Sequence, residues 1–422
     1  MEGITNIFSR AVLHLDLDAF FVSVALLQNS ALKGKPVLIG GRSRRGVVAS
    51  CSYEARRFGV HSAMPMRMAL NLCPDAIVLK GDMESYSYYS KLITDIIEEE
   101  APLFEKSSID EFYLDLTGMD QHIGCYKWSL ELRNKIMRES GLPISFGLSI
   151  NKLISKMGAG EAKPNGTKQV LPGGEKPFIH PLSIAKIPSI GKETYKKLSF
   201  MGVRTIHTLS GIPMRLLQRE FGKHGKSIWE KANAIDNSAV VPYTDKKSIS
   251  TERTFQVDTI NVKNLASILT GMVEKLGFEL RNMQRLTACI SVKIRYSDFN
   301  TYSKQKRIPY TANDKTLLRY AKELFDQLYE RRQLVRLVGV RLSNIVPGNY
   351  QISLFDDTTE EMNLLQTMDN IKTRFGAHAV GRASSLSANV KTLVGSSSTR
   401  AGATSKDTKR FSAFSRSRDG RR

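Results

Sequence analysis

The sequence predicts a multidomain α+β protein, and three patterns along the chain support this fold class. Residues 11–149 mix short strands with helices, an order that repeatedly returns the chain to one sheet. Residues 180–235 carry only helical patterns with short glycine-containing turns. Residues 249–346 follow the order β-α-β-β-α-β, which is typical of a ferredoxin-like unit. A chain of 422 residues is long enough for these regions to form separate cores.

The charge balance favours nucleic acid as the partner. Lysine and arginine total 62 against 41 acidic residues, which gives a formal net charge of +21. Such a charge attracts polyanions, and no basic amphipathic helix points to a membrane surface. No apolar run is long enough for a bilayer and no signal peptide begins the chain, so we expect a soluble, cytoplasmic protein. Four scattered cysteines without a Cys-x-x-Cys pair predict reduced thiols rather than a zinc site.

The first predicted strand lies within residues 11–21, where polar and apolar residues alternate. Its leucines point one way, and His14, Asp16 and Asp18 point the other way. This alternation predicts a half-buried strand. A helix is predicted over residues 19–28, with Asp18 available as its N-cap.

The elements that follow continue the mixture of strands and helices. Strands are predicted over residues 35–40, 46–52, 108–116 and 144–149. Helices are predicted over residues 65–72, 84–100 and 126–140. In the region after residue 248, strands are predicted over 249–257, 287–296, 301–309 and 336–346, and helices over 261–284, 313–331 and 359–375.

A second acidic pair, Asp110 and Glu111, interrupts an apolar run. Buried carboxylates are costly unless they are paired or bind a metal, and Mg²⁺ prefers oxygen ligands. Asp16 and Asp110 are therefore candidates to bridge two Mg²⁺ ions, with the carbonyl of Leu17 as a further ligand. Strand alternation points Asp110 and Glu111 to opposite faces, so Glu111 joins them only if a hairpin turn or bulge intervenes. The alternative for either acidic pair alone is helix capping and solvation of a hairpin edge.

Two segments with basic side chains could bind the phosphate groups of a triphosphate substrate. Tyr53 and Arg56 lie one helical turn apart, so their tips can converge on a triphosphate. The alternative is a helix start at the surface with a solvated arginine. Lys163 precedes a Pro-Asn-Gly turn. A stiff turn here would hold the Lys163 ammonium where it could neutralise negative charge developing on a leaving group. The alternative is that this tripeptide is an ordinary turn.

Five ordered motifs carry a resemblance to a known family. They are Asp-Leu-Asp-Ala-Phe-Phe (16–21), Cys-Ser-Tyr-Glu-Ala-Arg (51–56), Ser-Ala-Met-Pro-Met (62–66), Ser-Ile-Asp-Glu (108–111) and Lys-Pro-Asn-Gly (163–166). Together they closely resemble the Y-family DNA polymerases, and the bacterial polymerase IV branch is the nearest match. The resemblance covers roughly residues 10–355.

The resemblance implies a right-hand polymerase fold with a ferredoxin-like palm, small fingers, a helix-hairpin-helix thumb and a β-α-β-β-α-β little finger. The implied regions are palm 10–20 and 82–170, fingers 21–81, thumb 171–240, linker 241–248, little finger 249–346 and tail 347–422.

The resemblance also assigns roles at the site. Asp16 and Asp110 would bind both Mg²⁺ ions with the carbonyl of Leu17, and Glu111 would join at the catalytic metal. The incoming nucleotide would be held by Phe20, Phe21, Ala49, Tyr53, Arg56 and Lys163. Phe21 matches the steric gate, a flat ring placed where a ribose 2′-hydroxyl would sit. Ala49 matches the small residue over the nascent base pair, and Asp18 matches an acid that is not a metal ligand.

Two basic regions would contact DNA. The thumb hairpin would present backbone N–H groups to a phosphate from Pro188, Ile190, Gly191 and Lys192. In the little finger the duplex would be tracked by Lys293, Arg295, Lys304, Lys306 and Arg307. The alternative for these charges is a solvated sheet face.

The tail holds the last motif. Residues Gln351, Ser353, Leu354 and Phe355 resemble the motif that binds the bacterial sliding clamp, the β subunit, and exposed apolar neighbours often mark a binding site. From residue 395 the tail is rich in Ser, Arg and Lys, which predicts disorder.

The resemblance implies a low-fidelity, DNA-template-directed polymerase for translesion synthesis, which extends primer–template DNA from dNTPs. We expect a monomer without proofreading, since the implied regions leave no segment for an exonuclease. Three alternatives stand beside it: a nucleotide cyclase, the catalytic subunit of a polymerase V-like complex, and a non-catalytic DNA-binding scaffold. The helical region after residue 180 disfavours the cyclase, the Lys-Pro-Asn-Gly and Tyr-Glu-Ala-Arg forms disfavour the polymerase V-like subunit, and the complete acidic set disfavours the scaffold.

Overall fold

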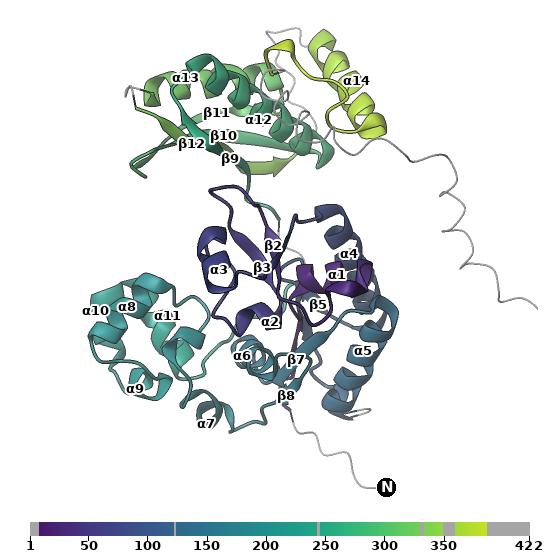
Figure 1. The fold of residues 1–422 in the computed structure, drawn as a ribbon, viewed down its shortest axis with the longest axis vertical. Helices are drawn as coiled ribbons and strands as arrows, with labels where there is room; N and C mark the ends of the chain where they lie inside the picture. Colours follow the sequence, from purple (N-terminus) through teal and green to yellow (C-terminus); the bar gives the residue numbers. More distant parts are fainter. Residues whose placement is uncertain (1–7, 122–123, 243–244, 330–332, 349–358, 386–422) are drawn as a thin grey trace, which may run out of the picture. The chain divides into compact units, whose positions relative to one another are not determined.

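The computed structural model describes residues 8–121, 124–242, 245–329, 333–348 and 359–385 (Figure 1). The chain divides into two compact units, residues 1–244 and residues 245–422. Within the described ranges, none of the helices combines the length and the apolar character that a bilayer span requires. All four cysteines are free and buried.

The first unit is organised around a five-stranded sheet. Its elements are β1 (Val12–Leu17), α4 (Met83–Glu100), β5 (Phe104–Lys106), β6 (Glu111–Asp115), α5 (Cys125–Ser140), β7 (Ile144–Ser149), α6 (Lys152–Ala162) and β8 (Thr167–Gln169). The strand order is β5-β6-β1-β7-β8. The central strand β1 pairs antiparallel with both β6 and β7, so its residues are held on both edges.

Both faces of this sheet are covered. The leucines of β1 pack with Phe146 on one face, where Tyr126 of α5 contacts the Phe146 ring. Helix α6 covers the other face, and it approaches so closely that a Cβ at Gly147 would lie 2.0 Å from the carbonyl oxygen of Ser155. The predicted half-buried strand is therefore wrong: His14 on its polar face is completely buried, because α6 lies over that face.

The predicted strand over residues 108–116 is shorter than expected. Residues 107–110 form a turn between β5 and β6, and the strand begins at Glu111. The N–H of Ser107 donates to the carbonyl of Glu111 at 3.0 Å, which closes this hairpin. The turn removes Asp110 from the strand alternation, and this is the geometry that Glu111 required in order to join the other acids.

The remainder of the first unit comprises a small sheet and a helical region. The small sheet has the order β3-β2-β4. Its strands and associated helices are α1 (Phe20–Gln28), β2 (Val37–Gly40), β3 (Val48–Cys51), α2 (Tyr53–Arg56), α3 (Met66–Leu72) and β4 (Ile77–Leu79). The helical region contains α7 (Glu175–Ile179), α8 (Lys192–Phe200), α9 (Ile206–Ser210), α10 (Met214–Phe221) and α11 (Lys223–Ala232).

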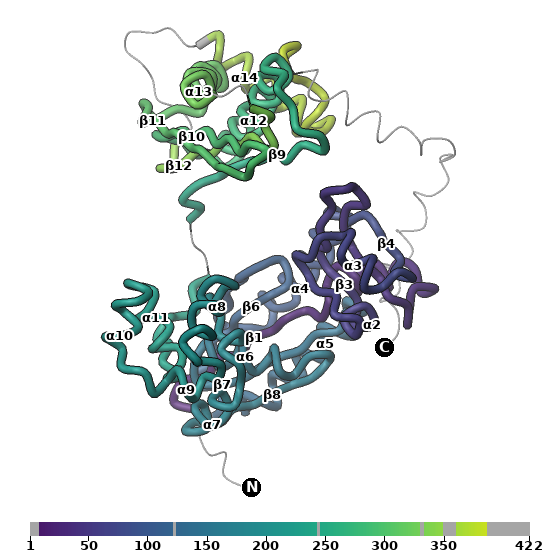
Figure 2. Tube along the Cα trace, turned by 60° about the vertical axis from the view of Figure 1, so that its left-hand side comes forward, coloured from purple at the N-terminus to yellow at the C-terminus, as the bar shows by residue number. Residues whose placement is uncertain are grey.

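The second unit follows the predicted β-α-β-β-α-β order. It contains β9 (Ser248–Thr259), α12 (Val262–Asn282), β10 (Arg285–Tyr296), β11 (Thr301–Thr311), α13 (Asp314–Leu328), β12 (Val335–Pro347) and the additional helix α14 (Thr359–Phe375). The strands lie in the order β11-β10-β12-β9, with α12 and α13 on one face (Figure 2). Helix α14 is tied to this unit by Arg281, which binds both Asp314 and Asp369.

The predicted DNA-tracking residues of this unit divide between the two faces of its sheet. Lys293 and Arg295 alternate with the buried Val292 and Ile294, so they lie on the face opposite the helices. Lys306 instead binds Glu323 of α13 at 2.7 Å, and Lys304 is paired with Val292 in the register, on the same side as Lys306. Strand alternation therefore turns Lys304 and Lys306 toward the helices, whereas Lys293 and Arg295 share the other face, as predicted.

Candidate active site

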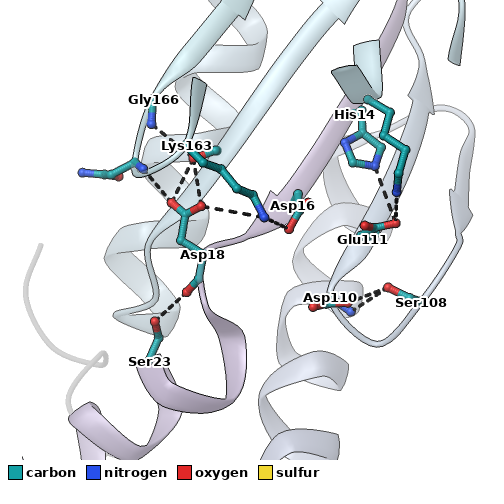
Figure 3. Close-up of polar contacts among 12 residues, drawn as sticks. His14, Asp16, Asp18, Ser23, Ser108, Asp110, Glu111, Lys163 and Gly166 are labelled. Atoms are coloured by element: carbon teal, nitrogen blue, oxygen red, sulfur yellow. Dashed lines mark hydrogen bonds and ion pairs between the residues drawn. The ribbon is translucent and has the colours of Figure 1, made fainter. Parts of the chain in front are cut away.

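Three acidic residues meet at one end of the five-stranded sheet. Asp16 and Glu111 are register partners on β1 and β6, so their side chains lie on the same face. Asp110 stands in the turn directly before β6, and its carbonyl accepts from the N–H of Leu17 at 3.1 Å. Ser108 Oγ donates to Asp110 Oδ1 at 2.6 Å (Figure 3). The fold thus joins residues that are nearly 100 positions apart.

Two lysines neutralise two of these carboxylates. Lys163 Nζ lies 2.5 Å from Asp16 Oδ1, and Lys156 Nζ lies 2.5 Å from Glu111 Oε2. Contact with His14, together with the ion pair to Lys156, lowers the pKa of Glu111 to about 2. Burial outweighs the effect of Lys163 and raises the pKa of Asp16 to about 6. The two opposed carboxyl groups therefore differ strongly in proton affinity.

His14 is a buried neighbour of Glu111. Its Nε2 lies 3.9 Å from Glu111 Oε2, and its ring is 4.5 Å from that of Tyr113 between centroids. Burial lowers the pKa of His14 to about 4, so its ring is neutral at pH 7. The imidazole thus adds no permanent charge beneath the acids.

Asp18 anchors the turn that carries Lys163. Its buried carboxylate accepts hydrogen bonds from Ser145 Oγ at 3.1 and 2.9 Å and from the N–H of Asn165 at 2.6 Å (Figure 3). The prediction that Asp18 caps the following helix is wrong. The N-cap of α1 is Ala19, in a left-handed conformation and without a side-chain cap. A buried carboxylate needs several donors, and the turn and β7 supply them.

A pocket next to the acids gathers most of the predicted site. We call it the acidic pocket, and it is lined by Asp16, Leu17, Ala19, Phe20, Phe21, Ala49, Ser50, Arg56, Ser62, Asp110, Glu111 and Lys163. Its members come from the sheet end, from α1, and from the small sheet with α2. Carboxylates therefore face cationic side chains and an aromatic ring across one hollow, an arrangement suited to a nucleotide triphosphate with its metal ions.

Tyr53 stands just outside this lining. Its hydroxyl donates to Asp18 Oδ1 at 3.4 Å, and the Arg56 guanidinium lies over its ring at 4.6 Å from the centroid. Burial raises the pKa of Tyr53 to about 12, so it remains a neutral donor. Tyr53 thus supports Arg56 and shares the Asp18 network with the Lys163 turn.

The donor set suits a hard divalent cation. Three carboxylates and the backbone at Leu17 offer only oxygen ligands, which Mg²⁺ prefers. Among the described residues, no group of three or more His, Cys, Asp or Glu side chains is arranged closely enough to hold a metal ion. Here Asp16 and Glu111 are instead occupied by Lys163 and Lys156.

The predicted thumb residues lie beside a second hollow. Pro188 and Ile190 line it together with Asp16. Gly191 is the N-cap of α8, which begins at Lys192. The clamp-motif residues lie outside the described ranges: Gln351, Ser353, Leu354 and Phe355.

The sequence prediction missed the residues that support the acids from behind. Lys156 belongs to no recognisable motif, and its position on α6 places it over Glu111 only after α6 packs on the sheet. Ser145 is likewise an ordinary strand residue in the sequence. Asn165 was visible within Lys-Pro-Asn-Gly, but the motif does not reveal that its N–H binds Asp18.

Comparisons with known proteins identify the family of this chain. Residues 15–160 match the model of the impB/mucB/samB family, and residues 246–354 match that family's C-terminal domain. Residues 185–236 match a model described as the thumb domain of DNA polymerase iota. The chain is 36% identical over 375 residues to DNA polymerase IV of Dehalococcoides mccartyi strain CBDB1, covering 88% of this chain and 96% of that protein. It is 35% identical to DNA polymerase IV of Listeria innocua over 346 residues, which cover 81% of this chain and 97% of that protein.

Solved structures agree in fold. The Y-family DNA polymerase chimera Dbh-Dpo4(243-245)-Dbh matches with a TM-score of 0.72 at 26% identity, covering 80% of this chain and 100% of that one. DinB from Sulfolobus solfataricus matches with a TM-score of 0.56 at 26% identity over the same shares of the two chains. The predicted right-hand polymerase fold is thereby confirmed. This chain belongs to the Y-family of DNA-directed DNA polymerases, in the polymerase IV (DinB) branch.

Proposed function

We propose that this translesion polymerase transfers a nucleotide from a dNTP to the primer 3′-hydroxyl by two-metal chemistry in the acidic pocket. The observation that carries the proposal is the convergence of Asp16, Asp110 and Glu111 with Arg56 and Lys163 around one hollow. Phosphoryl transfer needs mainly positioning and charge neutralisation, and these residue types supply both.

Each group in the pocket has a distinct task in this proposal. Asp16, Asp110, Glu111 and the carbonyl of Leu17 would hold two Mg²⁺ ions. When bound, these ions supply positive charge to the attacking and leaving oxygens. Arg56 and Lys163 would orient the triphosphate, and the charge of Lys163 would stabilise the departing pyrophosphate. Lys163 can do so only by leaving Asp16, which it binds here.

Nucleotide selection would rest on the apolar side of the pocket. Phe21 stacks on Tyr86 with ring centroids 4.2 Å apart and an interplanar angle of 18°, which fixes the ring against α4. A ring held this way suits the proposed steric gate, because it cannot rotate freely to admit a 2′-hydroxyl. The buried Phe20 lies next to it, with ring centroids 5.6 Å apart, and the small, exposed Ala49 would leave space over the nascent base pair.

The proposed path of DNA uses regions beyond the pocket. In this assignment residues 10–20 and 82–170 are the palm, residues 21–81 the fingers, residues 171–240 the thumb and residues 249–346 the little finger. The turn from Pro188 to Lys192 would bind a backbone phosphate through its N–H groups. Lys293 and Arg295, on the helix-free sheet face, would contact the duplex backbone.

Primer extension on undamaged and abasic templates tests the function. With Mg²⁺ we expect wild-type synthesis on both templates. We expect Asp110→Asn to lose at least about 10³-fold in rate, because a bridging charge is removed. Primer–template affinity should remain, which separates lost chemistry from lost binding. Absence of wild-type synthesis at any Mg²⁺ concentration would overturn the proposal.

We further propose that the enzyme acts as a monomer, binds the sliding clamp through residues 351–355 and lacks proofreading. The double variant Leu354→Ala with Phe355→Ala should abolish clamp-stimulated synthesis and leave basal synthesis intact. Excision of a mispaired 3′ nucleotide by the purified wild type would contradict the absence of proofreading. Light scattering checks the monomer.

A further inference from the structure

A basic hollow lies beside the turn that carries Asp110. It is formed by α4 and by the β5–β6 turn, and it is lined by Ser87, Ser90, Lys91, Thr94, Lys106, Ser108 and Ile109. None of these residues lines the acidic pocket. The hollow thus combines two lysines with four hydroxyl groups, and no carboxylate is among the described residues that line it.

Lys106 differs from the lysines around the acids. Its Nζ donates to Thr94 Oγ1 at 2.8 Å and to the carbonyl of Ser90 at 3.4 Å. Its ammonium also lies 5.5 Å from the centroid of the Phe112 ring. In the described part of the chain, no carboxylate stands within ion-pair distance of Lys106, whereas Lys156 is paired at 2.5 Å.

Lys91 likewise has no ion pair among the residues that the structure describes, and it is exposed at the same hollow. Asp95 acts on Lys106 only at a distance beyond an ion pair. Two cations that form no ion pair within the described part of the chain, next to hydroxyl groups, form a site for an anion with several oxygens. The partial burial that lowers the pKa of Lys106 agrees with a cation that gains from an anionic partner.

The neighbouring chemistry identifies the source of this anion. Ser108 belongs to the hollow and also donates to Asp110 at 2.6 Å, so the hollow adjoins the acids directly. If the acids extend a primer as proposed above, its 3′ end lies at them, and the nearest backbone phosphates would be those of the primer strand. We propose that Lys106 and Lys91 bind a backbone phosphate of the primer strand close to its 3′ end. This inference rests on the proposed function, because it requires the primer terminus to lie at the acids.

The test measures primer–template binding without Mg²⁺ or dNTP, by fluorescence anisotropy over a series of salt concentrations. We expect Lys106→Gln to raise Kd about 3- to 10-fold and to reduce the slope of log K against log salt by about 0.7–0.9, the loss of one phosphate contact. Lys91→Gln should act in the same direction. The matched control is Lys127→Gln, an exposed lysine on α5 that forms no ion pair with the residues the structure describes, and it should change neither quantity.

Neutral methylphosphonate linkages then locate the phosphate. Placed one at a time along the primer, they should weaken wild-type binding at one or two positions near the 3′ end. At those positions Lys106→Gln should be insensitive, since the contact is already lost. Insensitivity that maps instead to a template-strand phosphate would overturn the inference, as would behaviour identical to Lys127→Gln.

A further arm separates DNA from other phosphate sources. If the hollow bound the incoming triphosphate, Lys106→Gln would raise KM for dNTP and leave DNA affinity unchanged. If it bound free phosphate, the variant would weaken inhibition by inorganic phosphate and again leave DNA affinity unchanged. Either result would overturn the proposal. Unchanged thermal unfolding of the variant shows that the fold is intact. Wild-type extension in parallel distinguishes failure of this inference from failure of the polymerase assignment.

Discussion

The two large sheets of this protein use polar residues in opposite ways. The five-stranded sheet is covered on both faces, and its acids meet at one strand end, where Asp16 and Glu111 each have one ion-pair partner. The four-stranded sheet of the second unit is covered by helices on one face, and Lys293 and Arg295 stand on the other. A site at the end of a covered sheet depends on the fixed positions of a few atoms. The helix-free face of the four-stranded sheet would instead attract DNA through the summed charge of many residues, to which each residue adds little.

The largest effect of a single substitution is expected on the discrimination between dNTP and rNTP, which would depend on one fixed ring in the acidic pocket. We expect Phe21→Ala to lower discrimination against ribonucleotides by about 10- to 100-fold, because the ring that would meet the 2′-hydroxyl is removed. Tyr310→Ala, which removes an exposed aromatic ring in the second unit, is the control and should leave discrimination unchanged. Single-nucleotide incorporation with matched dNTP and rNTP measures the ratio. Equal discrimination in wild type and Phe21→Ala would refute the gate.

The opposed acids should respond oppositely to pH. The folded pKa of Asp16 is raised to about 6, so the stability it contributes is fully present below pH 4 and is lost as the pH rises through 6. The folded pKa of Glu111 is lowered to about 2, so its contribution is present above pH 4.5 and is lost as the pH falls toward 2. In chelator at pH 7, we therefore expect Asp16→Asn to stabilise and Glu111→Gln to destabilise, each on the order of 1–2 kcal/mol.

Thermal unfolding of both variants between pH 4 and pH 7 measures these shifts. The gain from Asp16→Asn should grow with pH across this range, since the wild type bears the cost of ionisation only above pH 4. Equal shifts of the same sign in both variants would show that the two carboxyl groups share one environment.

The smallest effects should come from the face of the second sheet that carries Lys293. We expect Lys293→Ala to weaken primer–template binding only about 2- to 5-fold and to reduce the salt slope by about 0.7–0.9, because it contributes one phosphate contact among many. Each lysine is ion-paired, Lys293 with Glu252 at 2.5 Å and Lys306 with Glu323 at 2.7 Å, so the two differ in the face of the sheet that they occupy. Lys306→Ala removes the same charge from the helix side, away from the face proposed to contact DNA, and should leave the slope unchanged. A slope change of equal size in both variants would show that position on the sheet is irrelevant. The rate at saturating DNA should stay constant in each.

Much of the fold was predictable because it depends on local pattern. The alternation in β10 and the helical period of α12 and α13 produced the correct element order of the second unit. Errors arose where distant segments compete for the same residue. Asp18 has the side chain of a helix cap, but Ser145 and Asn165, from segments far along the chain, bind its carboxylate. The polar face of β1 was predicted to meet solvent, because nothing in its own sequence announces that α6 will cover it.

The sequence alone determined which residues this protein has to work with: the acids, the side chains proposed to bind phosphate, the order of elements and the family. Motifs and periodicity are local properties of the chain. Only the tertiary structure decided how the acids are held. The 107–110 turn lets Asp110 stand beside Asp16 and Glu111, and the packing of α6 places Lys156 on Glu111. The same folding placed Lys106 beside that turn, where its Nζ donates to Thr94 and to the carbonyl of Ser90. Pairing and burial arise between residues far apart in the chain, and no local pattern encodes them.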